Sequence, residues 1–333
     1  MDLKFASSPS ESTWERPCVP MWTLQDLTEN EAAGNSNDTS PRAQALRRAQ
    51  RELYDLCRGT GPCSDIENFF EAWKDPNHPD QVQPNALLWF EVSELYGKAF
   101  ENDRVDAARV LLAHRVKPRD PDLWAALKIL EETGSKHGLE IILEAGWGID
   151  KPTNSSPTSH TSTLLGRLVD NEDLVDWCLS LGASPNATGP LGVTPMHSAA
   201  SSGSIRTLET LMAHGGIIEG TDLVAHAAST HKFKNGRIEM IQYLLDNGVP
   251  IDAYYMGHSK RWNSGGNSFY LLDGHQNALH MAISYNNKEM VEFLLSRGAD
   301  RNLEMFSLNT QFKWMRPREL ASLLGHEDIV ALL

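Results

Sequence analysis

Cysteines, long apolar runs and an excess of basic residues are all scarce or missing in this sequence. Four cysteines in 333 residues are too few for a disulfide-stapled fold, and they favour reduced thiols in an intracellular protein. The apolar stretches fall far short of the ~20 residues that a membrane helix needs. The first ten residues also lack the basic and apolar regions of a secretory signal. We therefore expect a protein of the cytoplasm, the nucleus or both, with no membrane partner.

Acidic residues outnumber basic ones. The sequence has 44 Asp and Glu against 30 Lys and Arg, a formal net charge of −14. Because phosphate binding depends on clustered Lys and Arg, this balance disfavours direct binding of nucleic acid. The same balance favours another protein as the partner, and a basic surface on that protein would be complementary.

The motifs of common catalytic and nucleotide-binding sites do not occur in the sequence. We find no Gly-x-Gly-x-x-Gly, no Gly-x-x-x-x-Gly-Lys-Ser/Thr, no His-Glu-x-x-His and no Gly-x-Ser-x-Gly. Cys57 and Cys63 have the wrong spacing for a zinc-binding pair, and no second cysteine pair completes one. We therefore expect no enzyme activity, no cofactor and no metal ion.

Glycines recur at regular intervals over much of the chain. Gly146 and Gly182 are 36 residues apart, and steps of 33 residues lead from Gly182 to Gly215 and from Gly215 to Gly248. The next step, to Gly298, is 50 residues, about one repeat plus an insertion. A fixed period of this size indicates a repeat architecture, in which each unit packs on its neighbours.

Two of these units open with the same short motif. Residues 194–200 read Thr-Pro-Met-His-Ser-Ala-Ala, and residues 277–282 read Asn-Ala-Leu-His-Met-Ala. The motif and the period resemble the ankyrin repeat, which opens with Thr-Pro-Leu-His-x-Ala and recurs about every 33 residues. The resemblance implies an all-α fold, an ankyrin-repeat solenoid of about six to seven helix-turn-helix units with hairpin loops.

The motif residues have structural roles in this interpretation. Thr194 is placed to cap a helix, and Pro195 follows at a first helical position, where a missing N–H is tolerated. Gly215 and Gly298 suit left-handed caps at the ends of the second helices.

The resemblance implies a further role for the histidines. In the family, the Thr and His of the motif hold neighbouring loops by hydrogen bonds, which assigns this role to His197 and His280. We favour it over metal binding or catalysis, because neither histidine has a second ligand at a metal-like spacing. In the fifth unit, which ends at Gly248, Ala225 stands where we expect the His. In the third unit, which ends at Gly182, Leu165 stands there. We therefore expect weaker loop contacts in both units.

Composition divides the chain into three parts. Residues 1–41 are rich in Ser, Thr, Asn, Pro and acidic residues, which predicts a disordered tail. Residues 42–83 predict a short helical cap, with helices over 42–58 and Asp65–Trp73, because the ends of a solenoid need covers. Residues 84–333 form the expected repeat domain.

The insertion at 253–275 predicts a β-hairpin tip, with a turn at residues 263–266. Aromatic and Arg side chains often anchor interfaces, and a smaller insertion at 301–315 adds more aromatics. The alternative is that these aromatics pack on one another and on the stem. Our candidates for partner binding are Tyr255, Arg261, Trp262, Tyr270, Phe306 and Trp314.

Three functions follow from this interpretation. The first is a non-catalytic scaffold or adaptor, monomeric, that binds a partner protein in the concave groove and on the hairpin tips. The second is a transcription coregulator that acts through a bound transcription factor. The third, a regulatory domain of an enzyme, is disfavoured by the missing catalytic motifs.

Overall fold

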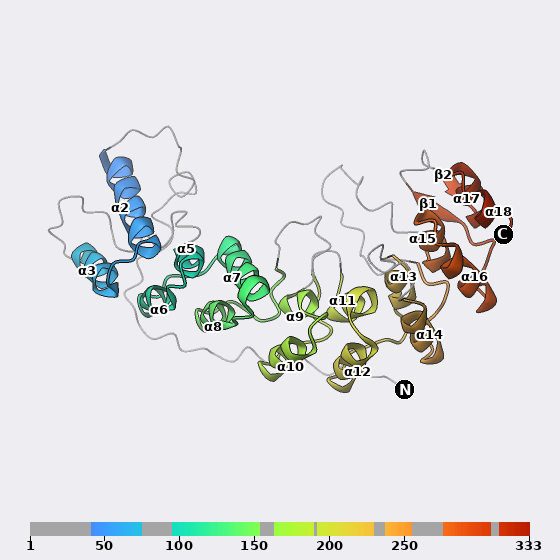
Figure 1. Cartoon of the computed structure of the whole chain (residues 1–333), viewed down its shortest axis with the longest axis horizontal. Helices are drawn as coiled ribbons and strands as arrows, with labels where there is room; N and C mark the ends of the chain where they lie inside the picture. The colour runs from blue at the N-terminus through green and yellow to red at the C-terminus, as the bar shows by residue number, and fades with distance from the viewer. Residues whose placement is uncertain are drawn as a thin grey trace, which may run out of the picture. The chain divides into compact units, whose positions relative to one another are not determined.

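The structure is a computed structural model that describes residues 41–74, 95–153, 163–189, 192–229, 237–254, 276–307 and 313–333. The chain divides into two compact units, Met1–Val92 and Ser93–Leu333, and Figure 1 shows their helices. The expected tail, up to residue 40, and the expected domain boundary at residue 84 lie outside the described residues.

The first unit contains two described helices, α2 (Pro41–Arg58) and α3 (Cys63–Lys74), close to the two that the sequence predicts. They pack on each other. In α2 the buried residues Ala45, Ala49, Leu53 and Cys57 recur every four positions, which puts them on one side of the helix. A cap over the first repeat stays a prediction.

The second unit is a series of stacked helix pairs. Within the described residues there are seven pairs, each with a first and a second helix. They are α5 (Leu95–Glu101) with α6 (Val105–Ala113), α7 (Asp120–Thr133) with α8 (His137–Glu144), α9 (Leu164–Arg167) with α10 (Glu172–Ser180), α11 (Pro195–Ser202) with α12 (Ile205–Ala213), α13 (Leu223–Ala228) with α14 (Ile238–Asp246), α15 (Ala278–Ser284) with α16 (Lys288–Ser296), and α17 (Pro317–Leu323) with α18 (Glu327–Val330).

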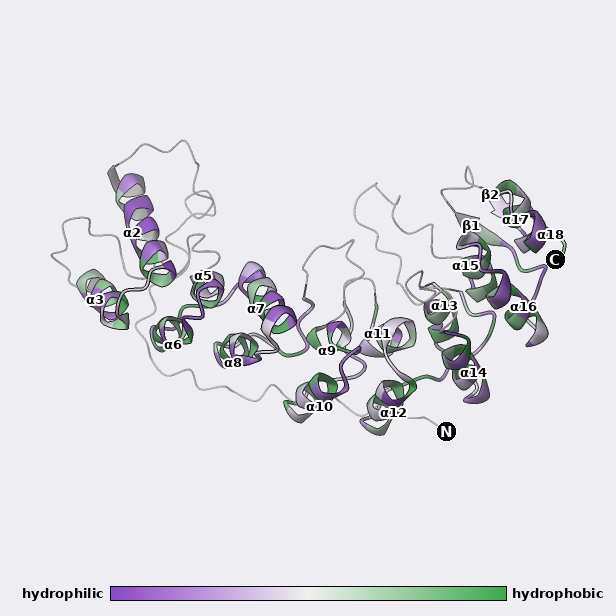
Figure 2. Ribbon diagram, in the orientation of Figure 1, coloured by the Kyte–Doolittle hydropathy of each residue, from purple (hydrophilic) through white to green (hydrophobic). Residues whose placement is uncertain are grey.

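The pairs stack in two layers. First helices contact first helices, from α9 through α11, α13 and α15 to α17, and second helices such as α10 and α12 contact each other in the same order. Fully buried alanines, Ala199 and Ala200 in α11, allow close packing in the first layer, and Leu208 and Leu211 of α12 are buried in the second. Figure 2 shows hydrophobic and hydrophilic residues sharing the same helices, as amphipathic packing requires. The all-α solenoid is therefore confirmed.

Glycines end the second helices in the left-handed conformation. The φ angles are 91° at Gly146, 86° at Gly182, 89° at Gly215, 83° at Gly248 and 93° at Gly298. A side chain at such a position would be strained. The regular glycine spacing in the sequence therefore reflects one backbone requirement that recurs at the end of each unit.

The third residue of several first helices binds the backbone just before the helix. In α7 this residue is Asp122, which accepts the N–H of Arg119 at 2.9 Å and that of Gly97, in the preceding unit, at 2.9 Å. In α17 it is Glu319, which accepts the N–H of Arg316 at 2.9 Å. Carboxylates in the second and seventh units thus perform the capping role that the family motif gives to histidine.

The third and fifth units lack such a side chain. Thr163 precedes α9, so the position equivalent to His197 is Gly166 and not Leu165; our alignment of that unit was wrong by one residue. With no side chain to bind it, the buried Thr163 hydroxyl has no hydrogen-bond partner among the described residues. In the fifth unit the position is Ala225, as expected.

The loops between units are joined by one recurring hydrogen bond. The acceptor is the side chain four residues after the left-handed glycine of one unit. The donor is the backbone N–H two residues after the left-handed glycine of the following unit. Asp150 accepts from Ser184 at 2.9 Å, and Asn186 accepts from Ile217 at 3.0 Å. Asp252 accepts from Asp300 at 3.1 Å, across the longer step that contains the insertion.

The smaller insertion forms a short antiparallel pair, β1 (Met305–Ser307) and β2 (Lys313–Met315). Phe306 pairs with Trp314 in its register. The hairpin predicted at 253–275 lies, from residue 255 on, outside the described residues. None of the described helices has the length and apolarity to cross a membrane.

Candidate functional site

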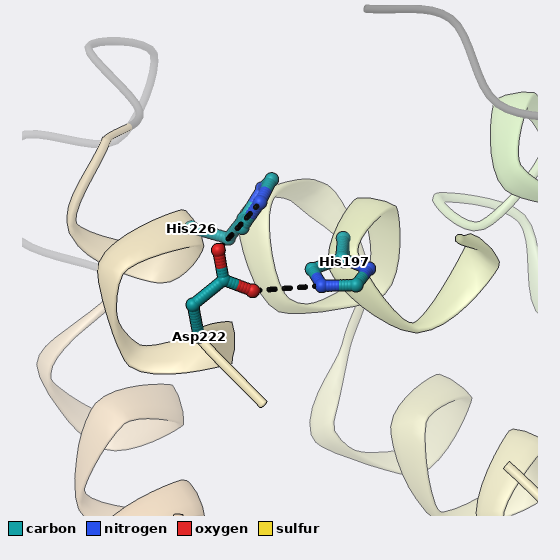
Figure 3. A group of neighbouring side chains, drawn as sticks. All are labelled: His197, Asp222 and His226. Atoms are coloured by element: carbon teal, nitrogen blue, oxygen red, sulfur yellow. Dashed lines mark hydrogen bonds and ion pairs between the residues drawn. The ribbon is translucent and has the colours of Figure 1, made fainter. Parts of the chain in front are cut away.

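The junction of the fourth and fifth units holds a buried cluster of two histidines and one aspartate. His197 comes from α11, Asp222 directly precedes α13, and His226 lies one turn into α13 (Figure 3). The Nε2 atom of His197 is 2.8 Å from Oδ1 of Asp222, and Nε2 of His226 is 3.8 Å from Oδ2. The carboxylate thus faces the Nε2 atoms of both imidazole rings, whose centroids are 4.5 Å apart.

The hydrogen bonds assign the tautomer of His197. Its Nδ1 atom is 3.1 Å from the backbone nitrogen of Thr194, a group that can only donate. Nδ1 must therefore accept, and the ring proton sits on Nε2, where it is donated to Asp222. Thr194 Oγ1, at 2.7 Å from Nδ1, supplies a second donor.

The three side chains are almost fully shielded from solvent. His197, Asp222 and His226 are 8%, 2% and 5% exposed. A buried carboxylate is costly unless donors or cations compensate it. The imidazole N–H of His197 provides such compensation, and it joins two consecutive repeat units through side chains.

A buried arginine reinforces the same junction. Arg237, which directly precedes α14, donates from Nη1 to the carbonyl of Gly203 at 2.9 Å and from Nη2 to those of Ala199 and Ala200 at 3.1 and 2.6 Å. These carbonyls end α11, where a cation favours the helix dipole. Burial lowers the pKa of Arg237 to about 10, which still leaves it charged at neutral pH.

The junction also lacks the recurring loop bond. At this junction the acceptor position, four residues after Gly215, is Glu219, and the donor position, two residues after Gly248, is Pro250. Proline has no N–H to donate. We expected weaker contacts at the fifth unit from Ala225 alone. Instead, Asp222, His226 and Arg237 supply a different set of contacts to the fourth unit.

The other motif histidine lies in a similar but distinct network. Nδ1 of His280 is 2.7 Å from Oδ1 of Asn277, and Nδ2 of Asn277 donates to Asp252 at 3.2 Å. Burial lowers the pKa of His280 to about 4, opposed in part by the nearby carbonyl of Leu303. That carbonyl makes no hydrogen bond to Nε2, so the effect of burial on the pKa is the larger one. The ring is therefore neutral at pH 7.

The remaining motif residues have the expected geometry. Thr194 is the residue before α11, Pro195 is the first residue of that helix, and Gly215 and Gly298 have the left-handed φ that we expected. Cys178, which we expect to be a reduced thiol, is buried, and burial raises its pKa to about 12. This thiol is therefore unreactive in the folded protein.

The structure describes part of the proposed partner-binding set. Trp314, on β2, is 52% exposed, and Phe306 pairs with it on β1. Tyr255, Arg261, Trp262 and Tyr270 lie outside the described residues, so their role stays a prediction.

Sequence reasoning missed Asp222, His226 and Arg237. The spacing Asp222-x-x-x-His226 could have indicated a pair on one side of a helix. Their convergence on His197 and on the end of α11 depends on how two units stack, and no short motif encodes it.

Comparison with known proteins agrees with this architecture. A family model described as ankyrin repeats (3 copies) matches residues 167–255 and 233–305. Stacked helix pairs closed by left-handed glycines define a repeat solenoid, and these matches identify the repeat. Ankyrin repeats are therefore present in residues 167–305 of the chain.

Three relatives show how far the likeness extends. The human transient receptor potential cation channel subfamily A member 1 is 24% identical over 284 residues, 72% of this chain and 25% of the channel. Potassium channel AKT1 of Arabidopsis thaliana is 30% identical over 177 residues, 49% of this chain and 20% of that protein. Ankyrin repeat and KH domain-containing protein mask-1 of Caenorhabditis elegans is 26% identical over 286 residues, 79% of this chain and 11% of that protein. The chain thus spans a quarter or less of each relative.

Proposed function

We propose that this chain is a non-catalytic interaction module that binds a partner protein through the loop tips and first helices of its repeat units. Ankyrin repeats generally mediate protein–protein interactions, and this carries the proposal. A solenoid offers an extended surface to a partner.

Trp314 is our first candidate for a contact residue. Its side chain is half exposed, and its strand belongs to the pair that lies between α16 and α17 in the sequence. Trp is among the residues that most often dominate binding energies. Phe306 on the paired strand, and Tyr255, Arg261, Trp262 and Tyr270 of the larger insertion, extend this proposed set.

The charges of the two helix layers differ and suggest the chemistry of the partner. The first helices α11, α13 and α15 contain no Asp, Glu, Lys or Arg. By contrast, four of the second helices, α8, α10, α14 and α18, contain Asp or Glu but no Lys or Arg: Glu140, Glu144, Glu172, Asp173, Asp176, Glu239, Asp246, Glu327 and Asp328. The acidic layer would attract a partner with a basic surface and speed its association. The uncharged first helices α11, α13 and α15 suit neutral polar and apolar contacts.

Affinity capture with the full chain tests the proposal. We expect Trp314→Ala to lose at least one specific partner protein that the wild type retains at physiological salt. Leu181→Ala is the matched control, because Leu181 is 48% exposed but ends the second helix α10, away from the proposed contact residues in sequence. Equal recovery of every partner by both variants would remove Trp314 from the site, and failure of the wild type to retain any partner would count against the module itself.

The coregulator hypothesis gains no specific observation from the described residues, and we do not propose it.

A further inference from the structure

The cluster at the junction of the fourth and fifth units has the donor set of a metal site. The candidate ligand atoms of His197, Asp222 and His226 all lie within 4.8 Å of one another, and all three residues are buried. We propose that these three residues bind one divalent transition-metal ion, with Zn²⁺ as the best fit, and that the ion clamps the two repeat units together. The three residues are buried, and none of them belongs to the proposed partner-binding set.

The donor types select the class of metal. Two imidazole nitrogens and one carboxylate oxygen suit Zn²⁺, whereas Ca²⁺ and Mg²⁺ prefer oxygen ligands alone. Three protein ligands leave a fourth tetrahedral position for water or for a further group. His197 has no second ligand at a metal-like spacing in the sequence, but stacking of the units brings two candidate ligands to it.

The distances are close to those that a bound ion requires. Ligand atoms about 2.0–2.1 Å from a tetrahedral ion lie about 3.3 Å from one another. The present separations from Asp222 are 2.8 Å to His197 and 3.8 Å to His226. Shifts of about half an ångström at these two contacts, and of at most about 1.5 Å between the two histidine nitrogens, which lie within 4.8 Å of each other, would form the site. Both Asp222 and His226 lie on the same turn of the chain entering α13.

Metal binding changes the tautomer of His197 in a way that the structure accommodates. Nε2 now donates its proton to Asp222, so binding the ion there requires the proton to move to Nδ1. Thr194 Oγ1, at 2.7 Å from Nδ1, can accept a hydrogen bond from the Nδ1–H once its hydroxyl rotates away, and a ligand histidine commonly donates its other N–H in this way. The backbone N–H of Thr194 loses its 3.1 Å bond to Nδ1. That loss is small beside the binding free energy of a structural zinc ion.

Burial of the site predicts how the ion behaves. Because the three residues are at most 8% exposed, the ion enters and leaves only when the junction opens locally. We therefore expect slow exchange, and metal binding should raise the thermal midpoint of the repeat domain by linkage.

The test uses the full chain, stripped of metal by a chelator under mildly denaturing conditions and refolded. We expect one equivalent of Zn²⁺ per chain by elemental analysis, and Co²⁺ in its place should give the intense visible bands of four-coordinate cobalt. Asp222→Asn and His226→Gln should weaken Zn²⁺ binding by at least about tenfold, since the loss of even an outer-shell partner has that effect. His214→Gln, at an exposed histidine, should leave it unchanged.

Two results would overturn the proposal without depending on the variants' folding. One is a wild-type chain that binds well under one equivalent of Zn²⁺ with no rise in thermal midpoint. The other is a cobalt spectrum of a six-coordinate ion only. Unchanged Zn²⁺ affinity in a folded His226→Gln chain would also overturn it, and circular dichroism reports whether each variant is folded.

Discussion

Arg237 donates a 2.6 Å hydrogen bond from Nη2 to the carbonyl of Ala200, and so a residue of the fifth repeat unit closes a helix of the fourth. The carbonyls at the end of a helix have no partner within it. In α11 the carbonyls of Ala200 and Gly203 accept from the neighbouring unit, which makes the end of one helix depend on the stacking of the next pair.

Replacing this arginine should therefore destabilise the repeat domain. We expect Arg237→Met to lower the free energy of unfolding by about 3 kcal/mol, because it leaves buried carbonyls without donors. Urea denaturation followed by circular dichroism measures the change. Arg206→Met is the control: its side chain is 76% exposed and pairs with Glu172 at 3.3 Å, a surface pair worth less than about 0.5 kcal/mol. Equal losses in the two variants would contradict the role assigned to Arg237.

His280 should make stability depend on pH. Its pKa is lowered from 6.5 to about 4, so the unfolded chain binds the proton more readily than the folded one. The stabilisation is present above about pH 6.5 and is lost as the pH falls towards 4, to the extent of about 3 kcal/mol. The difference between wild type and His280→Gln, measured by urea denaturation at several pH values, should shrink over this range. A constant difference would show that His280 is not buried in its neutral form.

Two threonines at equivalent positions should respond in opposite ways to the same substitution. Thr194→Val removes the 2.7 Å contact to His197 and should cost about 1 kcal/mol. Thr163→Val removes a buried hydroxyl without a hydrogen-bond partner among the described residues, so it should be neutral or stabilise by up to about 1 kcal/mol. Thermal denaturation of the two variants side by side checks the contrast, and a large loss in Thr163→Val would refute it.

The loop hydrogen bonds predict a similar contrast between two acidic residues. Asp150→Ala loses the bond to the N–H of Ser184 and should lower the free energy of unfolding by about 1 kcal/mol. Glu219→Ala should change it by less than about 0.5 kcal/mol, because its counterpart, Pro250, has no N–H. Chemical denaturation measures both, and an equal loss at Glu219 would mean that this residue makes another contact that matters.

Much of the fold was predictable from local pattern. The helices predicted over 42–58 and Asp65–Trp73 agree closely with α2 and α3, and the regular glycines predict the left-handed caps, because both features depend on residues close together in the chain. The alignment of the third unit failed by one residue. Its motif lacks the histidine, and without it only the observed start of α9 after Thr163 sets the register.

The candidate site was only partly predictable. His197 was visible in its motif, but it was assigned a structural role alone. Its partners lie 25 and 29 residues further on in the chain, in Asp222 and His226, and a search for short ligand spacings does not reach them.

The repeat period, the capping glycines, the acidic balance and the helical pairs were determined by the sequence alone, because each depends on local backbone preference or on composition. Only the tertiary structure decided which buried polar groups meet. Stacking brings His197 to Asp222, and Arg237 to the end of α11, across unit boundaries. Such contacts depend on how the apolar faces of neighbouring units pack, and many different combinations of apolar side chains give the same pattern in the sequence.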